Sequence, residues 1–192
     1  LRVDVNIQLL GQQSQAASLA QVMVGQSRAT NFAESWTFNL NQPSPLLFDG
    51  LTGLNHDVRL YTDNGQLQYQ GLLQDSALWQ LAAGEYRLDV MANDPQVLGD
   101  YQFTLTDIAA APLLNLDQSV TINPSGEQAQ VYRIHSPIEQ LLALQLQASV
   151  NSSGKLSLYD ASGNLLTQAN LQDTQGLFNG EFSSDYREKV LV

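Results

Sequence analysis

Residues 57–67 read DVRLYTDNGQL, and residues 155–165 read KLSLYDASGNL, which is the same pattern 98 residues further along the chain. In both stretches, apolar residues alternate with polar ones up to a short turn that contains a glycine, Gly65 or Gly163. Glycine reaches the positive φ that tight hairpin turns require. The stretch therefore predicts a β-hairpin that occurs twice.

The similarity between the two halves extends beyond the hairpin. At the same offset of 98, residues 73–76 match residues 171–174, and Val22 and Val24 match Val120 and Ile122. Residues 36–38 match residues 132–134 at an offset of 96, and residues 86–87 match residues 186–187 at an offset of 100. Self-similarity at a fixed period is the signature of repeated structural units. We expect a first repeat over residues 10–108 and a second over residues 109–192, the second without its final strand. Residues 1–9 are then the equivalent of the last strand of a preceding repeat.

The rest of each half also reads as β structure. Residues 86–92 alternate between apolar and polar side chains, which is the period that places one face of a strand on a core. Roughly seven or eight short strands with frequent turns are typical of an antiparallel sandwich. The predicted fold class is all-β, with two tandem antiparallel β-sandwich (jelly-roll-like) domains of about 98 residues each. The expected aromatic core residues are Trp36, Phe38, Tyr101 and Phe103.

Two further stretches carry a family resemblance. Residues 101–109 read YQFTLTDIA and lead to QVYRI at residues 130–134, and residues 81–90 read LAAGEYRLDV. These stretches resemble the junction and the "aGxYxLxV" strand of bacterial pre-peptidase C-terminal (PPC-like) β-sandwich repeats. The resemblance implies a module of secreted bacterial proteins, of the kind that forms arrays in large RTX-type surface adhesins. It also implies an extracellular or cell-surface location.

The composition excludes several classes of function. The 192 residues include 8 basic and 19 acidic side chains, which gives a net charge of −11. Such a chain repels nucleic-acid phosphates and anionic membranes, so we expect no nucleic-acid partner. We also expect no membrane insertion, because no apolar run approaches the roughly 20 residues that cross a bilayer. The absence of cysteine excludes disulfides, thiol catalysis and zinc–thiolate sites.

Calcium is the one cofactor that the acidic residues favour. Oxygen-ligand sites for Ca²⁺ need carboxylates and carbonyls gathered in loops. Asp94 and Asp100 bracket such a stretch and are the candidate calcium ligands. A second set of loop acids is Asp49, Asp57 and Asp63. The alternative is that all of these are solvated acids that keep the protein soluble.

Other candidate site residues are few. Trp79 and Tyr69 fit no clear inward phase, so they are the candidate ligand-binding aromatics, because an exposed ring can stack on a sugar. His56 and His135 read as surface-loop residues. No catalytic residue is predicted, since the sequence contains neither a G-x-S-x-G elbow nor a phosphate-binding loop.

Together these observations favour a non-enzymatic repeat module of a large secreted or cell-surface bacterial protein, acting as a structural spacer or adhesion segment. One alternative is a carbohydrate- or peptide-binding module, with or without calcium. Another is an accessory domain of a secreted hydrolase. The expected partners are neighbouring repeats of the same protein, with a glycan or peptide as a further candidate.

Two expectations concern how repeats meet. The apolar residues 108–116 predict a junction that packs between the repeats and stiffens them, in contrast to a Gly/Ser-rich tether. Residues 1–7 resemble the strand that the second repeat lacks. Strand-swapped self-association by β-augmentation is therefore expected.

Overall fold

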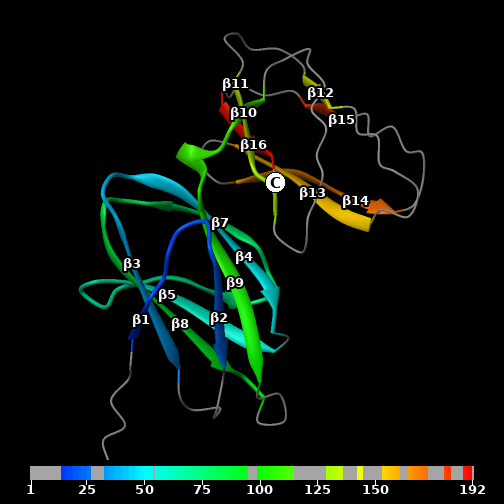
Figure 1. The fold of residues 1–192 in the computed structure, drawn as a ribbon. Helices are drawn as coiled ribbons and strands as arrows, with labels where there is room; N and C mark the ends of the chain where they lie inside the picture. The colour runs from blue at the N-terminus through cyan, green and yellow to red at the C-terminus, as the bar shows by residue number, and fades with distance from the viewer. Residues whose placement is uncertain are drawn as a thin grey trace, which may run out of the picture.

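The computed structural model describes residues 14–26, 33–53, 55–94, 99–114, 129–135, 142–144, 153–160, 164–172, 180–182 and 188–191. The first strands are β1 (Ser14–Ala16), β2 (Val22–Gln26), β3 (Glu34–Leu40), β4 (Ser44–Thr52), β5 (His56–Thr62), β6 (Leu67–Leu72), β7 (Ala77–Leu81), β8 (Gly84–Ala92) and β9 (Asp100–Asp107). A 3-10 turn, Ile108–Ala110, precedes β10 (Leu113–Leu114), β11 (Tyr132–His135), β12 (Leu142–Leu144), β13 (Ser153–Asp160), β14 (Leu165–Gln172), β15 (Gly180–Phe182) and β16 (Glu188–Leu191). Figure 1 shows β1–β9 in one body and β10–β16 in another, which we name the first and second unit.

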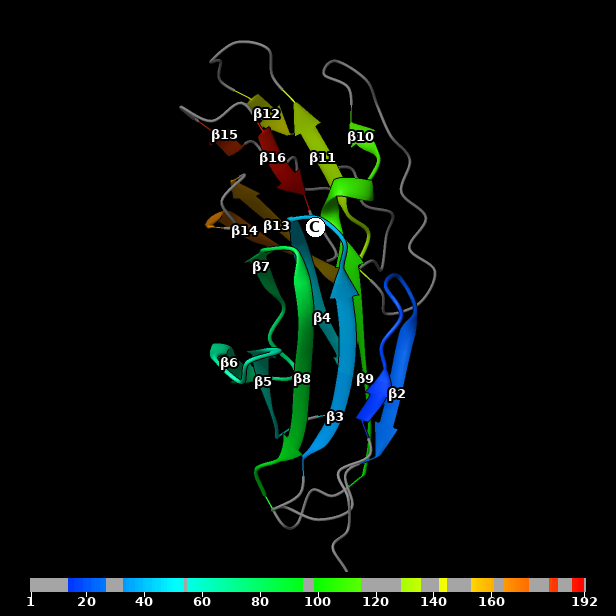
Figure 2. The ribbon, with the colours of Figure 1, turned by 90° about the vertical axis from the view of Figure 1, so that its left-hand side faces the viewer.

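The first unit is a sandwich of two sheets. One sheet has the order β1-β3-β8-β5-β6 and the other β2-β9-β4-β7, and they lie face to face (Figure 2). All neighbouring strands are antiparallel apart from β1 and β3. The predicted all-β antiparallel fold class is thereby confirmed. Among the described residues, no helix has the length and apolar character needed to cross a bilayer.

Aromatic side chains fill the space between these two sheets. Trp36 and Phe38 on β3 and Tyr101 and Phe103 on β9 are all buried, as predicted. The rings of Trp36 and Phe103 meet edge to face, with centroids 5.5 Å apart. Such a pair adds about 1 kcal/mol beyond the apolar area that it buries. These residues therefore hold β3 of one sheet against β9 of the other.

The two hairpins that the sequence repeat predicts have the same strand register. In the first unit, Leu60 on β5 pairs with Tyr69 on β6, and the ladder shifts directly after Leu60. In the second unit, Leu158 on β13 pairs with Thr167 on β14, and the ladder shifts directly after Leu158. The turn glycine of the first hairpin, Gly65, has φ +82°, as the turn prediction required. The repeat therefore extends from the residues to the strand pairing.

The order of the larger sheet also recurs. The second unit contains the order β10-β11-β16-β13-β14, which repeats β1-β3-β8-β5-β6 strand for strand. The parallel pairing of the first two strands is repeated as well. Strands β12 and β15 pair with each other as β4 and β7 do in the first unit. The division into two separate domains between residues 108 and 109 stays a prediction.

The last strand differs from the sequence alignment. The alignment placed residues 86–87 opposite 186–187, an offset of 100. In the structure Leu60 pairs with Leu88, whereas its equivalent Leu158 pairs with Leu191, an offset of 103. The alignment of the final strand was therefore wrong in this structure. Residues 1–9 lie outside the described residues, so their assignment as a strand and the strand swap built on it stay predictions.

Candidate functional site

Strand β4 is buried on both faces. Leu46 and Phe48 point into the core of the first unit, and Leu47, on the opposite face, is also fully buried. Because successive side chains of a strand alternate, a second apolar group must cover Leu47. That group is the junction cluster, which consists of Leu47, Ile108, Ala111, Val131 and Tyr159, with Leu78 and Ala129 packed against it.

The junction cluster joins three parts of the chain. Leu47 belongs to the first unit, Ile108 and Ala111 to the connecting turn, and Val131 and Tyr159 to the second unit. A fully buried aliphatic side chain contributes roughly 2 kcal/mol. Several such side chains therefore resist separation of the units.

A buried carboxylate adds a polar contact across the same junction. Asp49 on β4 is only 8% exposed. Its Oδ1 accepts a hydrogen bond from the Ser76 hydroxyl (2.8 Å), and its Oδ2 accepts one from the backbone N–H of Ala129 (3.0 Å). Hydrogen bonds to an ionised group are worth about 1.5–3 kcal/mol when they form. Asp49 thus ties the outer face of the first unit to the chain that leads into the second.

Burial at the junction also acts on Tyr159. Burial raises the pKa of its hydroxyl, and the nearby charge of Asp49 raises it further, while the hydrogen bond with Ser157 lowers it. The hydroxyl is therefore protonated at neutral pH. A neutral phenol beside Asp49 spares the junction a second buried negative charge.

The connecting segment is held by hydrogen bonds along its length. Asp107 caps the 3-10 turn, because its Oδ1 accepts a hydrogen bond from the backbone N–H of Ala109 (2.9 Å). Arg133 on β11 donates twice, from its backbone N–H to Pro112 O (2.9 Å) and from Nε to Ala111 O (3.1 Å). The segment then pairs with β11 as β10. Of the expected apolar junction, only Ile108 and Ala111 are buried in the junction cluster, whereas Ala109, Ala110, Pro112 and Leu113 are exposed. Residues 115–116 lie outside the described residues.

A second polar group, which the sequence did not reveal, lies among β1, β2, β3 and β9. Trp36 Nε1 donates to Tyr101 Oη (2.8 Å), and Tyr101 Oη donates to Glu34 Oε2 (2.7 Å). The backbone N–H of Gln26 and the side-chain amide of Gln15 also donate to Glu34. Burial above all, and also Glu34, raise the pKa of Tyr101, which keeps its hydroxyl available as a donor. Its members come from four separate stretches, so no spacing in the sequence identifies the group.

Replacing Tyr101 with phenylalanine is expected to destabilise the first unit by about 2 kcal/mol. The substitution leaves Trp36 Nε1 buried without an acceptor and removes a donor from Glu34, which costs more than the bond itself is worth. Urea denaturation measures the change. Tyr132→Phe is the control, since its half-buried hydroxyl donates a longer hydrogen bond (3.3 Å) to Gln130 Oε1. Equal destabilisation by both variants would contradict this account.

The candidate calcium ligands do not form a complete site among the described residues. Asp100 is exposed, and its Oδ1 accepts a hydrogen bond from Gln26 Nε2 (2.8 Å). Asp94 is described, but residues 95–98 between the two acids are not. Within the described ranges, no group of three or more histidine, cysteine, aspartate or glutamate side chains could hold a metal ion. Calcium at Asp94 and Asp100 stays a prediction.

The second set of acids is dispersed among separate hydrogen bonds. Asp49 serves the junction, as described above. Asp57 accepts a hydrogen bond from Asn93 Nδ2 (3.2 Å), and Asp63 accepts one from the backbone N–H of Asn64 (2.8 Å) in the hairpin turn. Each carboxylate thus has its own local partner.

The expectation that Trp79 could be an exposed platform is wrong. Trp79 is 6% exposed and stacks on Phe48, with ring centroids 5.1 Å apart. Tyr69 is half-buried and packs against Trp79, with ring centroids 5.2 Å apart. Trp79 therefore belongs to the core, and sugar stacking on Tyr69 stays a prediction.

The surface-loop interpretation is also wrong for one histidine. His56 is 1% exposed, lies 3.1 Å from Gly53 O through Nδ1, and packs against the Tyr101 ring. His135 is exposed at the end of β11. His56 is the first residue of β5, and its side chain lies on the same buried face as those of Val58 and Leu60. The sequence interpretation had instead placed His56 in the polar turn before the strand.

The fold and the junction define this chain as an antiparallel β-sandwich protein with a repeated sheet. No model of a known protein family matches the chain. No curated protein matches it at a significant level. A solved structure that it resembles is the pre-peptidase C-terminal domain of a collagenase from Bacillus anthracis, with 17% sequence identity and a TM-score of 0.44. The match covers 50% of this chain and 96% of that domain.

Proposed function

We propose that the chain is a non-enzymatic structural module that sets distance and orientation inside a larger secreted or cell-surface bacterial protein. The observation that carries the proposal is the junction cluster around Leu47, with the Asp49–Ala129 hydrogen bond beside it. A spacer transmits a fixed geometry only if its units cannot move independently. Apolar burial together with a charge-assisted hydrogen bond provides that restraint.

The surface chemistry supports the same role. The net charge of −11 opposes collapse of neighbouring modules onto each other. Glutamines such as Gln68 and Gln70 on β6 are polar without being ionic, so they keep the surface wet independently of salt. Because salt screens the repulsion between charges, a length that is independent of ionic strength must be set by the junction.

The proposal is tested by small-angle X-ray scattering over a range of salt. We expect the maximum dimension of the chain to stay constant between ~0.01 M and ~1 M NaCl, although the screening length changes about tenfold over that range. A dimension that contracts steadily as salt is added would show that charge repulsion, and not the junction, sets the length. Such contraction would overturn the spacer proposal.

The junction serves an accessory domain of a secreted hydrolase equally well, since such a domain must also be held at a fixed distance from its neighbour. The sequence that flanks this chain in its parent protein separates the two settings. Further copies of the repeat would place the module in an adhesin-type array. A hydrolase domain next to it would assign the accessory role.

A further inference from the structure

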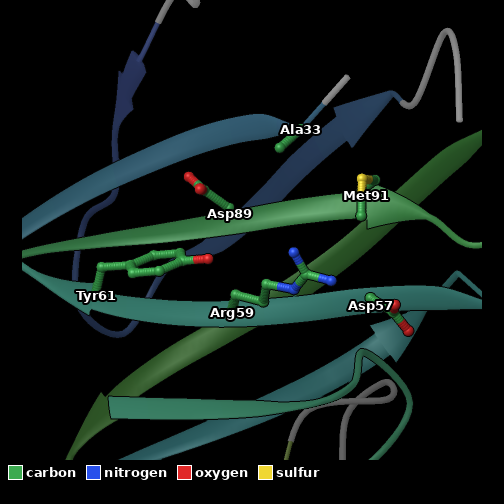
Figure 3. A pocket seen from close by; sticks show the side chains of 6 residues that line it. All are labelled: Ala33, Asp57, Arg59, Tyr61, Asp89 and Met91. Atoms are coloured by element: carbon green, nitrogen blue, oxygen red, sulfur yellow. The ribbon is translucent and has the colours of Figure 1, made fainter. Parts of the chain in front are cut away.

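The outer face of the larger sheet in the first unit contains a small depression. Its volume is about 40 Å³, which is room for roughly three water molecules or for one carboxylate group. It lies over β5 and β8 beside the start of β3 (Figure 3). The lining residues are Ala33, Asp57, Arg59, Tyr61, Asp89 and Met91.

The side chain of Arg59 lines this depression and is half-buried as a whole. Its Nε is buried and has no hydrogen-bond partner. A buried, charged donor that lacks an acceptor is costly, on the order of 1–3 kcal/mol or more. In Figure 3 the Tyr61 hydroxyl points along the face toward Arg59, so two donors converge there. The outer part of the Arg59 guanidinium and the Tyr61 hydroxyl therefore face an acceptor in the depression, and a guanidinium matches a carboxylate best.

The two neighbouring acids make their hydrogen bonds and ion pair with other residues. Asp89 pairs opposite Arg59 in the sheet, but its Oδ1 accepts the Ser35 hydroxyl (2.7 Å) and lies 3.0 Å from Arg87 Nε. Asp57 accepts from Asn93. Figure 3 shows the two carboxylates turned to opposite sides, with the guanidinium between them. In the described part of the chain, neither lies within ion-pair distance of Arg59.

We propose that this depression binds a sugar acid, such as a uronic acid residue of a glycan. The carboxylate of the sugar would pair with Arg59 and accept from Tyr61. Its ring hydroxyls would donate to the second oxygens of Asp57 and Asp89, which flank the cation and can each accept further bonds. Arg59 thus lies between two acceptors, Asp57 and Asp89, and this order matches a carboxylate with hydroxyl groups on either side of it. A peptide carboxylate brings fewer donors and fits less well.

The residues of the proposed site are not repeated at the equivalent positions of the second hairpin. The hairpin register places Lys155 at the position of Asp57 and Ser157 at the position of Arg59. Ser157 is buried, at 2% exposed. A feature needed only for a spacer would be expected at both positions, whereas Arg59 has serine as its counterpart.

The test is an NMR titration of the isotopically labelled chain with sodium glucuronate, read at the amides of residues 57–61 and 87–91. We expect saturable shifts with a Kd on the order of 1 mM. Glucose, which lacks the carboxylate, and acetate, which lacks the hydroxyls, should each bind at least tenfold more weakly. A glutamate-containing dipeptide is the peptide comparison and should also bind more weakly.

Two variants localise the effect. Arg59→Lys keeps the charge but removes the fork, and should weaken glucuronate binding at least tenfold. Lys155→Gln removes one positive charge from the second unit and should leave binding unchanged. Shifts that fail to saturate by ~50 mM would overturn the proposal. So would equal binding of acetate, glucose or the dipeptide, or full binding by Arg59→Lys in a chain whose amide spectrum is otherwise unchanged.

Discussion

A chain with alanine at position 50 is expected not to fold its first unit, or to lose on the order of 3 kcal/mol or more of stability. Gly50 lies on β4, where a Cβ would stand 1.5 Å from the backbone oxygen of Leu73 and 2.6 Å from its carbonyl carbon. A backbone atom cannot swing aside as the end of a side chain can. Leu73 is itself fully buried, so the chain that carries it has little room to retreat.

Gly99→Ala is the matched control for Gly50→Ala, because no atom of the described residues lies within 4 Å of a Cβ at that position. This control should change stability by less than about 0.5 kcal/mol. Circular dichroism during thermal and urea unfolding measures both variants. If Gly50→Ala melts with the wild type, the packing of β4 against residue 73 is not as described.

Replacing Leu47 with glutamate is expected to separate the two units without unfolding the first. The new carboxylate would be buried among the apolar side chains of the junction cluster, where an unpaired charge costs several kcal/mol. Opening the junction exposes the carboxylate to water and avoids that cost. Limited proteolysis should then cut within residues 108–114 at least about tenfold faster than in the wild type.

The control for Leu47→Glu is Val24→Glu, on the same sheet. Val24 is 56% exposed on β2, so a charge there remains in water. Its proteolysis pattern and melting temperature should match those of the wild type. Rapid cleavage of the linker in the wild type itself, or equal cleavage in Leu47→Glu and wild type, would contradict the junction described here.

Regular alternation made part of the fold predictable. Trp36, Phe38, Tyr101 and Phe103 stand at every second position and are all buried. The hairpin was predictable for the same reason, because its turn residues and its alternation occur twice. These strands place their large apolar side chains on one face, so the period of two identifies that face.

The junction was harder to predict because its strands bury both faces. Residues 46–48 are consecutive and apolar, and Leu78 stands next to Trp79. The side chains of Leu46, Phe48 and Trp79 enter the sandwich core, whereas those of Leu47 and Leu78 pack in the junction cluster. This is why Trp79 had no clear phase. Consecutive apolar residues on a strand were the available signal for a second covered face.

The polar groups could not be predicted, since they depend on register. Glu34 meets Tyr101 across 67 positions of sequence, and Arg59 lies opposite Asp89 only through the pairing of β5 with β8. The final strand shows the same difficulty, because short matches at an offset of 100 did not determine its pairing. Side-chain patterns identify faces, and distant partners require the assembled sheet.

The junction cluster is expected to hold the two units together as one rigid body. Residual dipolar couplings of the backbone amides measure this directly in a weakly aligned sample. Couplings from residues 33–94 and from residues 129–135 and 153–172 should fit one alignment tensor of common magnitude and orientation. Two tensors of different magnitude would mean that the units move independently, and the account of a stiff spacer would then be wrong.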